Sequence, residues 1–357
     1  MTEAGDATGV GYRAAGVDID AGAEAVRRIG PLVRSTYRPG VMGDIGGFGG
    51  LFDLARSGYR DPILVSATDG VGTKAEIARL TGRLDTIGRD LVAMCVDDLV
   101  CSGAAPLFFL DYLAVGRLDP EAVEHLVGGI AAGCSEAGCA LIGGEMAEHP
   151  GVMSADQFDL VGFAVGAVER EDVMDGSAAS SGDLLVAIDS PNLRSNGFSL
   201  ARHIVFDVAG RSLEDPAWEG SEGTLADELL APSVIYAPSV VAALAAHEVH
   251  AVAHVTGGGL PGNLSRVLGE DVDAVLDHTA WEVPRIFREL QDMGGVSDGE
   301  MARVFNLGVG MVLVVPPSEA DGVVATLESG ARPARVIGEL VPGTGTVAYS
   351  SAGGMGS

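Results

Sequence analysis

Three acidic side chains stand where they could bind a magnesium ion together with phosphate groups. Asp69 follows an apolar run in SATDGVGTK, Asp98 lies in VDDLVCSGAAP, and Glu145 follows a double glycine in LIGGEMAEHPG. Mg²⁺ prefers oxygen ligands and usually shares them with phosphates. We therefore predict that these three carboxylates hold Mg²⁺ at a nucleotide site. Asp69 alone could also be a turn residue that caps its own backbone.

The sequence contains a single lysine, Lys74, among its 22 basic residues. Lys74 follows Thr73 in a glycine-bounded turn directly after an apolar strand. A compact ammonium on a flexible stem can reach a phosphate in such a tight turn. We predict that Lys74 contacts a phosphate and that Thr73 belongs to the same nucleotide site. A lysine that survived biased codon usage by chance is the alternative.

Two glycine clusters could supply backbone N–H groups to a phosphate. GDIGGFGG contains Gly46, Gly47, Phe48 and Gly49, while Gly143 and Gly144 precede the candidate ligand Glu145. Glycine allows the backbone to approach an anion closely, although such clusters are also common in ordinary turns. We predict that both clusters bind the nucleotide.

In the second half of the chain, two polar segments come just before predicted helices. NLRSNGFSLAR contains Arg194, Ser195 and Asn196, and HVTGGGLPGN contains Thr256, Gly257 and Gly258. Because helix N-termini bind phosphate well, we predict that these segments bind a small phosphorylated substrate. For Ser195 alone, a simple helix cap is an equally good interpretation.

The elements that must position these residues alternate between strands and helices, which predicts an α/β protein of two domains. In the first half we expect strands at 63–68 and 107–115 and helices at 85–102 and from Asp119 to near Gly138. The small, polar stretch GSAASSG predicts the boundary, giving domains of residues 1–172 and 173–345 and a flexible tail of residues 346–357. In the second half we expect strands at 183–190, 249–257, 310–317 and 334–341, and helices around 196–206, 226–246, 284–293 and 318–328.

The composition excludes several classes of partner. With 50 acidic and 22 basic residues the formal net charge is −28, which repels nucleic acids and anionic membranes. No apolar run approaches the roughly 18 residues of a membrane span, and the N-terminus lacks the features of a secretory signal. We therefore expect a cytoplasmic protein. Its four cysteines contain no CxxC pair and predict neither a disulfide framework nor a zinc site.

Taken together, these segments resemble the phosphoribosylformylglycinamidine cyclo-ligases, also called aminoimidazole ribonucleotide synthetases. The resemblance spans nearly the whole chain, and Asp98 to Pro106 fit the superfamily pattern of Asp, four residues, then Gly-Ala-x-Pro. It includes the segments YRAAGVDIDAG, GDIGGFGGLFDL, ATDGVGTK, DTIGRDLVAMCVDDLVCSGAAPLFFLDYLAVG, GCALIGGE, DLVGFAVGAVE, SNGFSLAR, HVTGGGLPGNLSRVL and FNLGVGM.

The resemblance implies a homodimer whose N-terminal domains share a β-barrel, with ATP bound near the interface. It also implies a reaction in which ATP phosphorylates the formamide oxygen of formylglycinamidine ribonucleotide before an amidine nitrogen closes the ring. By matching position, Asp69, Asp98 and Glu145 become metal or nucleotide residues, and Lys74 becomes a phosphate contact. The implied cofactors are ATP and Mg²⁺.

Three positions depart from the family pattern. The family usually has LHSNG, GGETAE and a lysine after the first helix, whereas this chain has Arg194, Met146 and Gly30. Arg194, a permanent cation, replaces the histidine of LHSNG, whose side chain can exchange a proton near neutral pH. We predict that Arg194 acts with Lys74 and Asp98 in catalysis and binds an anion. A paralogue that activates a different amide or carboxylate, and a nucleotide-binding regulator without turnover, are the alternatives.

Overall fold

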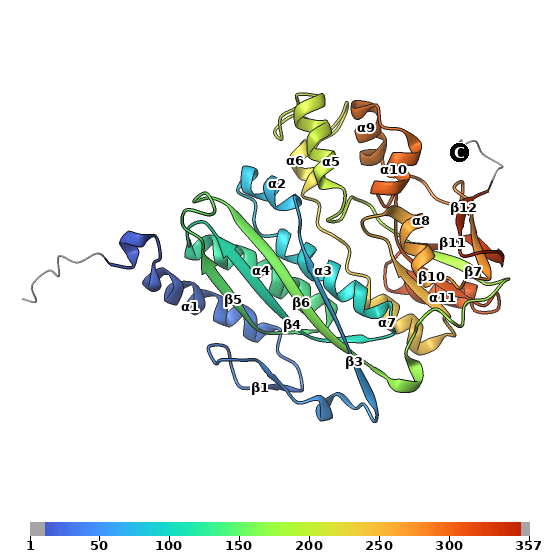
Figure 1. The fold of residues 1–357 in the computed structure, drawn as a ribbon, viewed down its shortest axis with the longest axis horizontal. Helices are drawn as coiled ribbons and strands as arrows, with labels where there is room; N and C mark the ends of the chain where they lie inside the picture. Colours follow the sequence, from blue (N-terminus) through green and yellow to red (C-terminus); the bar gives the residue numbers. More distant parts are fainter. Residues whose placement is uncertain (1–10, 351–357) are drawn as a thin grey trace, which may run out of the picture.

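The computed structural model describes residues 11–350, which form two α/β domains built on separate sheets (Figure 1). The first domain contains a four-stranded sheet in the order β3-β6-β4-β5. A small ribbon of β1 and β2 precedes this sheet in the chain. The expected α/β class is confirmed. The strands are β1 (Val41–Met42), β2 (Leu51–Phe52), β3 (Pro62–Gly70), β4 (Ala105–Val115), β5 (Ala140–Glu148) and β6 (Phe158–Glu169).

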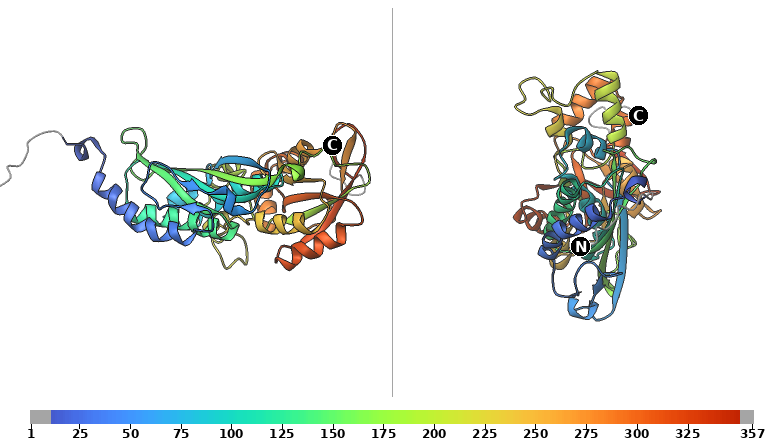
Figure 2. Two further views of the ribbon diagram at one scale, coloured as in Figure 1. Left: turned by 90° about the horizontal axis from the view of Figure 1, so that it is seen from below. Right: turned by 90° about the vertical axis from the view of Figure 1, so that its left-hand side faces the viewer.

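Helices cover one face of the four-stranded sheet, as the turned views show (Figure 2). The central helix α3 packs against β3 and β6, while α4 packs against β5 and carries α1 on its outer side. As predicted, the Asp119 side chain caps the start of α4 and Gly138 ends this helix with φ of 70°. The helices are α1 (Ile19–Ser35), α2 (Lys74–Thr81), α3 (Ile87–Val100) and α4 (Pro120–Ala137), with short 3-10 turns at Arg13–Ala15, Leu54–Ser57 and Arg170–Asp172.

The opposite face of this sheet carries exposed apolar side chains. Phe163 lies beside Leu110, and Val161 beside Tyr112, so that both pairs project from the same face. Phe163, Tyr112 and Val161 are 40%, 38% and 36% exposed. Apolar side chains thus remain partly exposed on the face of the sheet that the helices leave uncovered.

The second domain contains a six-stranded sheet in the order β12-β9-β11-β7-β10-β8. Its strands are β7 (Leu184–Asp189), β8 (Ala251–His254), β9 (Val272–Leu276), β10 (Val309–Val315), β11 (Ala334–Pro342) and β12 (Val347–Tyr349). Its helices are α5 (Phe198–Arg202), the π-helix η4 (His203–Val208), α6 (Leu225–Leu229), α7 (Ala237–Ala246), α8 (Gly259–Leu264), the 3-10 turn η5 (Ser265–Val267), α9 (Arg285–Gly294), α10 (Asp298–Val304) and α11 (Ala320–Ser329).

Two expectations for this domain were wrong. The helix expected over 226–246 is broken into α6 and α7. Pro232 lacks the N–H that a continuous helix needs, and the amide of Ser233 donates instead to Asp90 of the first domain at 2.8 Å. The tail expected from residue 346 contains β12, which pairs in parallel with β9, and the rest of that tail lies outside the described residues.

The two domains share one continuous hydrophobic core, because α3 lies between the first sheet and the second domain. On its outer side α3 contacts α7 and β8. Within residues 11–350, none of the helices is long and apolar enough to cross a membrane.

Candidate active site

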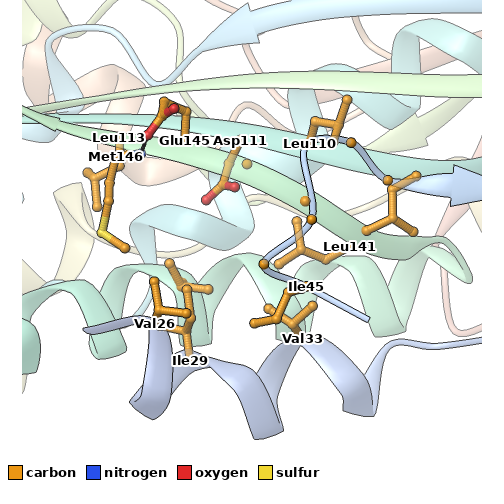
Figure 3. A pocket seen from close by; sticks show the side chains of 18 of the residues that line it. Val26, Ile29, Val33, Ile45, Leu110, Asp111, Leu113, Leu141, Glu145 and Met146 are labelled. Carbon is orange, nitrogen blue, oxygen red and sulfur yellow. Dashed lines mark hydrogen bonds between the residues drawn. The ribbon is translucent and has the colours of Figure 1, made fainter. Parts of the chain in front are cut away.

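A pocket of about 630 Å³ lies between α1, the segment joining β1 to β2, and strands β4 and β5 (Figure 3). The structure brings together both glycine clusters that the sequence singled out. Gly46, Gly47, Phe48, Gly49, Gly143, Gly144 and Glu145 all line it. Met146, one of the departures from the family pattern, also lines the pocket.

The pocket combines apolar walls with acidic side chains. Val26, Ile29 and Val33 project from α1, as Figure 3 shows, and further apolar walls come from α4, β4 and β5. Among the lining residues that the structure describes, the only charged side chains are the carboxylates Asp44, Asp111 and Glu145. An anionic ligand here must therefore bind to backbone N–H groups, to cations that enter with it, or to a basic side chain at the rim.

Asp111, on β4, is a site residue that our sequence analysis missed. Its carboxyl points into the pocket (Figure 3), and burial raises its pKa to about 7. A Cβ at Gly144 would collide with Asp111 Oδ1, so the second glycine of the pair makes room for this carboxyl. A single carboxylate inside the apolar run LFFLDYLAV was the signal that could have revealed it.

Gly30, another departure from the family pattern, lies on α1 beside the pocket. A Cβ at this position would lie 3.2 Å from Nη1 of Arg34, one turn further along the helix. Arg34 forms an ion pair of 2.9 Å with Asp44, which lines the pocket. An arginine thus stands close to the place where the family has a lysine.

A second group of predicted residues meets between the two domains. Asp98 Oδ1 lies 2.7 Å from Nδ1 of His254, at the end of β8. The other ring nitrogen of His254 contacts the guanidinium of Arg194, which in turn donates to Asp97 at 2.6 Å. Sequence analysis did not assign Asp97 or His254 to the site, because the partners of these two side chains lie on segments that are distant in the sequence.

The structure does not agree with the prediction that Arg194 binds an anionic ligand. Arg194 is 1% exposed, and its charge is already neutralised by the fully buried carboxylate of Asp97. Its guanidinium also lies 4.7 Å from the ring centroid of Tyr236. The backbone of Arg194 is left-handed, with φ of 60°, and the side chain of Asn192 holds it there by accepting from its amide at 2.9 Å. This conformation costs about 1–2 kcal/mol in a residue other than glycine.

The prediction that Lys74 contacts a phosphate also needs correction. Lys74 lies at the start of α2, is fully buried, and forms an ion pair of 2.8 Å with Asp90 on α3. It also donates to the backbone oxygens of Arg194 and Ala231 at 3.1 and 2.9 Å. Burial lowers the pKa of the ammonium, although Asp90 opposes this effect. In this arrangement Lys74 joins the domains and has no free face toward a ligand.

The three predicted magnesium ligands do not form one site within the chain. Burial raises the pKa of Asp69, and the nearby charge of Asp98 adds to this effect. Glu145, however, lies on β5 at the other edge of the sheet. Asp69, Gly162, Asp111 and Gly144 are neighbours across the four strands, and Glu145 directly follows Gly144. Three strand spacings thus separate Asp69 from this position, a distance of about 14 Å. The structure contains no cluster of three or more metal-ligating side chains between residues 11 and 350.

The remaining predicted residues come from neighbouring loops at the domain junction. Thr73 Oγ1 lies 3.1 Å from Ser199 Oγ, which connects the start of α2 to the start of α5. The Asn196 side chain comes within 3.9 Å of the Cβ position of Gly257. Ser195 Oγ and Asn196 Oδ1 have no hydrogen-bond partner among the described residues. Thr256 donates to Asn263 at 3.1 Å, and Gly258 precedes the first residue of α8 with φ of 107°.

Comparison with known proteins defines the class first. Residues 57–168 match the family described as AIR synthase related protein, N-terminal domain, and residues 180–350 match the corresponding C-terminal domain. Among solved structures, thiamine-monophosphate kinase from Stenotrophomonas maltophilia is 20% identical with a TM-score of 0.68, covering 90% of this chain and 96% of that one. The hydrogenase maturation protein HypE in complex with ATP is 17% identical with a TM-score of 0.64, covering 92% and 89%. These likenesses show a shared fold.

The curated relatives narrow the class further. Phosphoribosylformylglycinamidine cyclo-ligase of Geotalea daltonii is 50% identical over 92% of this chain and 94% of its own length. The enzyme of the same name from Shouchella clausii is 47% identical over 97% and 99%. The chain belongs to the phosphoribosylformylglycinamidine cyclo-ligase family.

Proposed function

We propose that the chain catalyses the ATP-dependent ring closure of formylglycinamidine ribonucleotide to aminoimidazole ribonucleotide. ATP transfers its γ-phosphoryl group to the formamide oxygen, the amidine nitrogen attacks that carbon, and the oxygen leaves as phosphate. The products are aminoimidazole ribonucleotide, ADP and phosphate. The observation that carries this proposal is the identity of about 50% to enzymes of that name over more than nine-tenths of the chain.

ATP is assigned to the pocket beneath the glycine segment Gly46–Gly49. A volume of about 630 Å³ lies within the range of roughly 300–1,000 Å³ usual for ligand pockets. The apolar walls suit a nucleobase, and the exposed backbone of the glycine segment suits phosphates. Because carboxylates that line the pocket repel a triphosphate, the nucleotide needs cations that enter with it.

Asp69 and Asp98 are the residues that would hold Mg²⁺, since the charge of Asp98 acts on the Asp69 carboxyl and adds to the rise of its pKa that burial causes. Mg²⁺ usually takes one or two carboxylates and completes its coordination with phosphate and water oxygens. Because Glu145 of the same chain lies about 14 Å from Asp69, an ion held here would neutralise phosphates of a nucleotide that reaches this pair from the pocket of a second copy. Glu145 belongs to the pocket and is assigned to the nucleotide alone.

The phosphorylated substrate is assigned to the loops of Ser195–Asn196 and Thr256–Gly258. The two unpaired oxygens of Ser195 and Asn196 support this assignment, because buried polar atoms normally have partners. The buried position of Arg194 removes the main reason to expect a different substrate, since the substituted side chain points into the protein interior.

A homodimer is part of the proposal. The four-stranded sheet ends in two edge strands, β3 and β5, and its uncovered face carries Phe163, Tyr112 and Val161. Edge strands and exposed apolar faces are commonly covered in a stable assembly. A second copy that covers this face could also bring residues of one pocket near Asp69 of the other subunit.

The test is a measurement of aminoimidazole ribonucleotide, ADP and phosphate after incubation with formylglycinamidine ribonucleotide, ATP and Mg²⁺. We expect equal amounts of all three products. If ATP is consumed only with a different amide or carboxylate, the assigned substrate is wrong. If no substrate leads to ATP consumption, the proposal that the protein is an enzyme is wrong.

Asp98→Asn should lower kcat at least tenfold while leaving the fold stable, because its side chain is 47% exposed and no cavity is created. Glu171→Gln is the matched control, since this carboxylate is 73% exposed and follows the far end of β6. Full activity of Asp98→Asn with unchanged Mg²⁺ dependence would remove Asp98 from the active site.

A further inference from the structure

Four side chains form a continuous hydrogen-bonded chain that crosses from one domain to the other. It runs from Asp97 through Arg194 and His254 to Asp98. Asp97 and Asp98 are neighbours on α3, whereas Arg194 and His254 follow β7 and end β8. This series of hydrogen bonds therefore begins and ends on α3 and passes through the second domain.

The buried end of this chain is held firmly. Asp97 Oδ1 accepts from the amides of Tyr236 and Ala237, both at 2.8 Å, and Oδ2 accepts from Arg194 at 2.6 Å. The same guanidinium nitrogen lies 3.1 Å from the carbonyl oxygen of Val234. The position of the arginine is thus set by fixed backbone groups and by a carboxylate without solvent contact.

The contact between Arg194 and His254 selects one tautomer of the imidazole. A guanidinium has only N–H donors, so Nε2 of His254 must present its lone pair to Arg194. The proton of the neutral ring then resides on Nδ1, which donates to Asp98 Oδ1 at 2.7 Å. Asp98 is the exposed end of the chain, with 47% of its side chain accessible, while His254 is 3% exposed.

We propose that Arg194 is a positioning residue that holds His254 in the Nδ1–H tautomer and so directs the free oxygen of Asp98 toward the reactants. This inference rests on the proposed function, which places Asp98 in the active site. It gives a physical role to the arginine that replaces the family histidine. A lysine at this position would present a single nitrogen, and it could not serve Asp97, Val234 and His254 with the same fixed fork.

The first measurement is the ¹⁵N NMR spectrum of the imidazoles in the wild-type protein, with His254→Gln used to assign the signals of His254. We expect a protonated Nδ1 and an unprotonated Nε2. A wild-type His254 with its proton on Nε2 overturns the proposal, whatever the variants show. This measurement needs no substrate and no variant of Arg194.

The second measurement uses Arg194→Met combined with Asp97→Asn, which removes both buried charges together. The asparagine side chain keeps an oxygen for the amides of Tyr236 and Ala237, so the fold is retained. Without the guanidinium, the imidazole is free to turn away from Asp98, whose carboxylate requires the Nδ1–H form while the ring stays in place. We therefore expect the Nε2–H tautomer of His254 to become populated and kcat to fall by roughly 10- to 100-fold, as when orienting partners of a histidine are removed elsewhere. The KM for ATP should change less than threefold.

The matched control is Arg332→Met combined with Glu136→Gln. Arg332 also bridges the domains, donating to Glu136 at 3.2 Å and to the carbonyl oxygen of Ile235 at 3.4 Å, but it does not contact His254. We expect no change of tautomer and less than a twofold change of kcat. A merely structural role of Arg194 predicts similar effects in both double variants.

The outcomes separate this inference from the proposed function. If the Arg194 double variant folds and keeps both the tautomer and kcat, the positioning role is wrong. If wild type shows the Nδ1–H tautomer but converts no formylglycinamidine ribonucleotide, the proposed function fails and the directed chemistry at Asp98 fails with it. The supporting result is a change of tautomer and a loss of kcat that occur together, in that variant alone.

Discussion

Replacing Lys74 by methionine tests whether the only lysine of the chain joins the domains or binds a phosphate. Lys74→Met keeps the length of the side chain but leaves the carboxylate of Asp90 without its counter-charge in a fully buried site. It also leaves the carbonyl oxygens of Arg194 and Ala231 without a donor. Breaking a buried ion pair in this way costs about 3–5 kcal/mol. Because domains are commonly stable by only about 5–15 kcal/mol, this loss is large.

A second substitution, Asp90→Asn, removes the carboxylate charge that Lys74→Met leaves without a partner. In Lys74→Met with Asp90→Asn, the asparagine oxygen still accepts from the amide of Ser233, which lies 2.8 Å from Asp90 Oδ1. We expect the double variant to recover about half of the lost free energy of unfolding, since a neutral amide is easier to bury than an unpaired carboxylate. A coupling of at least about 1 kcal/mol should therefore appear between the two positions.

The assay is urea unfolding followed by circular dichroism and tryptophan fluorescence, with the KM for ATP measured on the same preparations. Arg83→Met is the control, because Arg83 and Asp227 form an exposed ion pair of 2.6 Å between the same parts of the two domains. Its free energy of unfolding should stay within about 1 kcal/mol of wild type. If Lys74→Met is as stable as this control and its KM for ATP rises tenfold, Lys74 contacts a phosphate and our structural interpretation is refuted.

Two further predictions concern pH. Burial raises the pKa of Asp111 to about 7, so its ionisation opposes folding increasingly from about pH 4 and fully above about pH 7. Asp111→Asn should therefore raise Tm at pH 8, and the gain in unfolding free energy has an upper limit of about 4 kcal/mol. A gain that is equal at pH 5 and pH 8 would contradict this prediction. Burial alone lowers the pKa of His250, but its hydrogen bonds to Asp183 and Glu248 raise it overall above 6.5. The resulting stabilisation is complete below pH 6.5 and is lost as the pH rises through the folded-state pKa, so the difference in unfolding free energy between wild type and His250→Gln should be larger at pH 5.5 than at pH 9.

Local signals in the sequence predicted several elements well. Asp119, Pro120 and Glu121 mark the start of α4, and the helix begins there because the cap and the proline act on the backbone next to them. Both glycine clusters were predicted to bind the nucleotide, and the structure places them around one pocket; nucleotide binding there stays a prediction. The start of α4 depends on residues that are neighbours in the sequence, and Gly143 and Gly144 could be placed because they follow a predicted apolar strand.

Contacts between distant segments could not be predicted in the same way. Lys74 and Arg194 looked like phosphate ligands because their partners, Asp90 and Asp97, lie on a helix whose acidic residues could equally have faced solvent. The predicted helix over 226–246 failed partly because the local signal of Pro232 was overlooked. The contacts of Asp90 and Asp97 with backbone amides of the intervening segment, by contrast, could not be seen in the sequence. Which carboxylates become buried is decided by the packing of the second domain on α3.

The contacts of α3 bear on whether the protein can be divided. In a fragment that ended near the boundary at 176–182, Asp90 and Asp97 would lose the amides of Ser233 and Tyr236, and the part of the shared core behind α3 would be open to water. The complementary fragment would carry Arg194 without its counter-ion. Although two sheets and two family domains suggest modules, we therefore expect neither fragment to fold stably without the other.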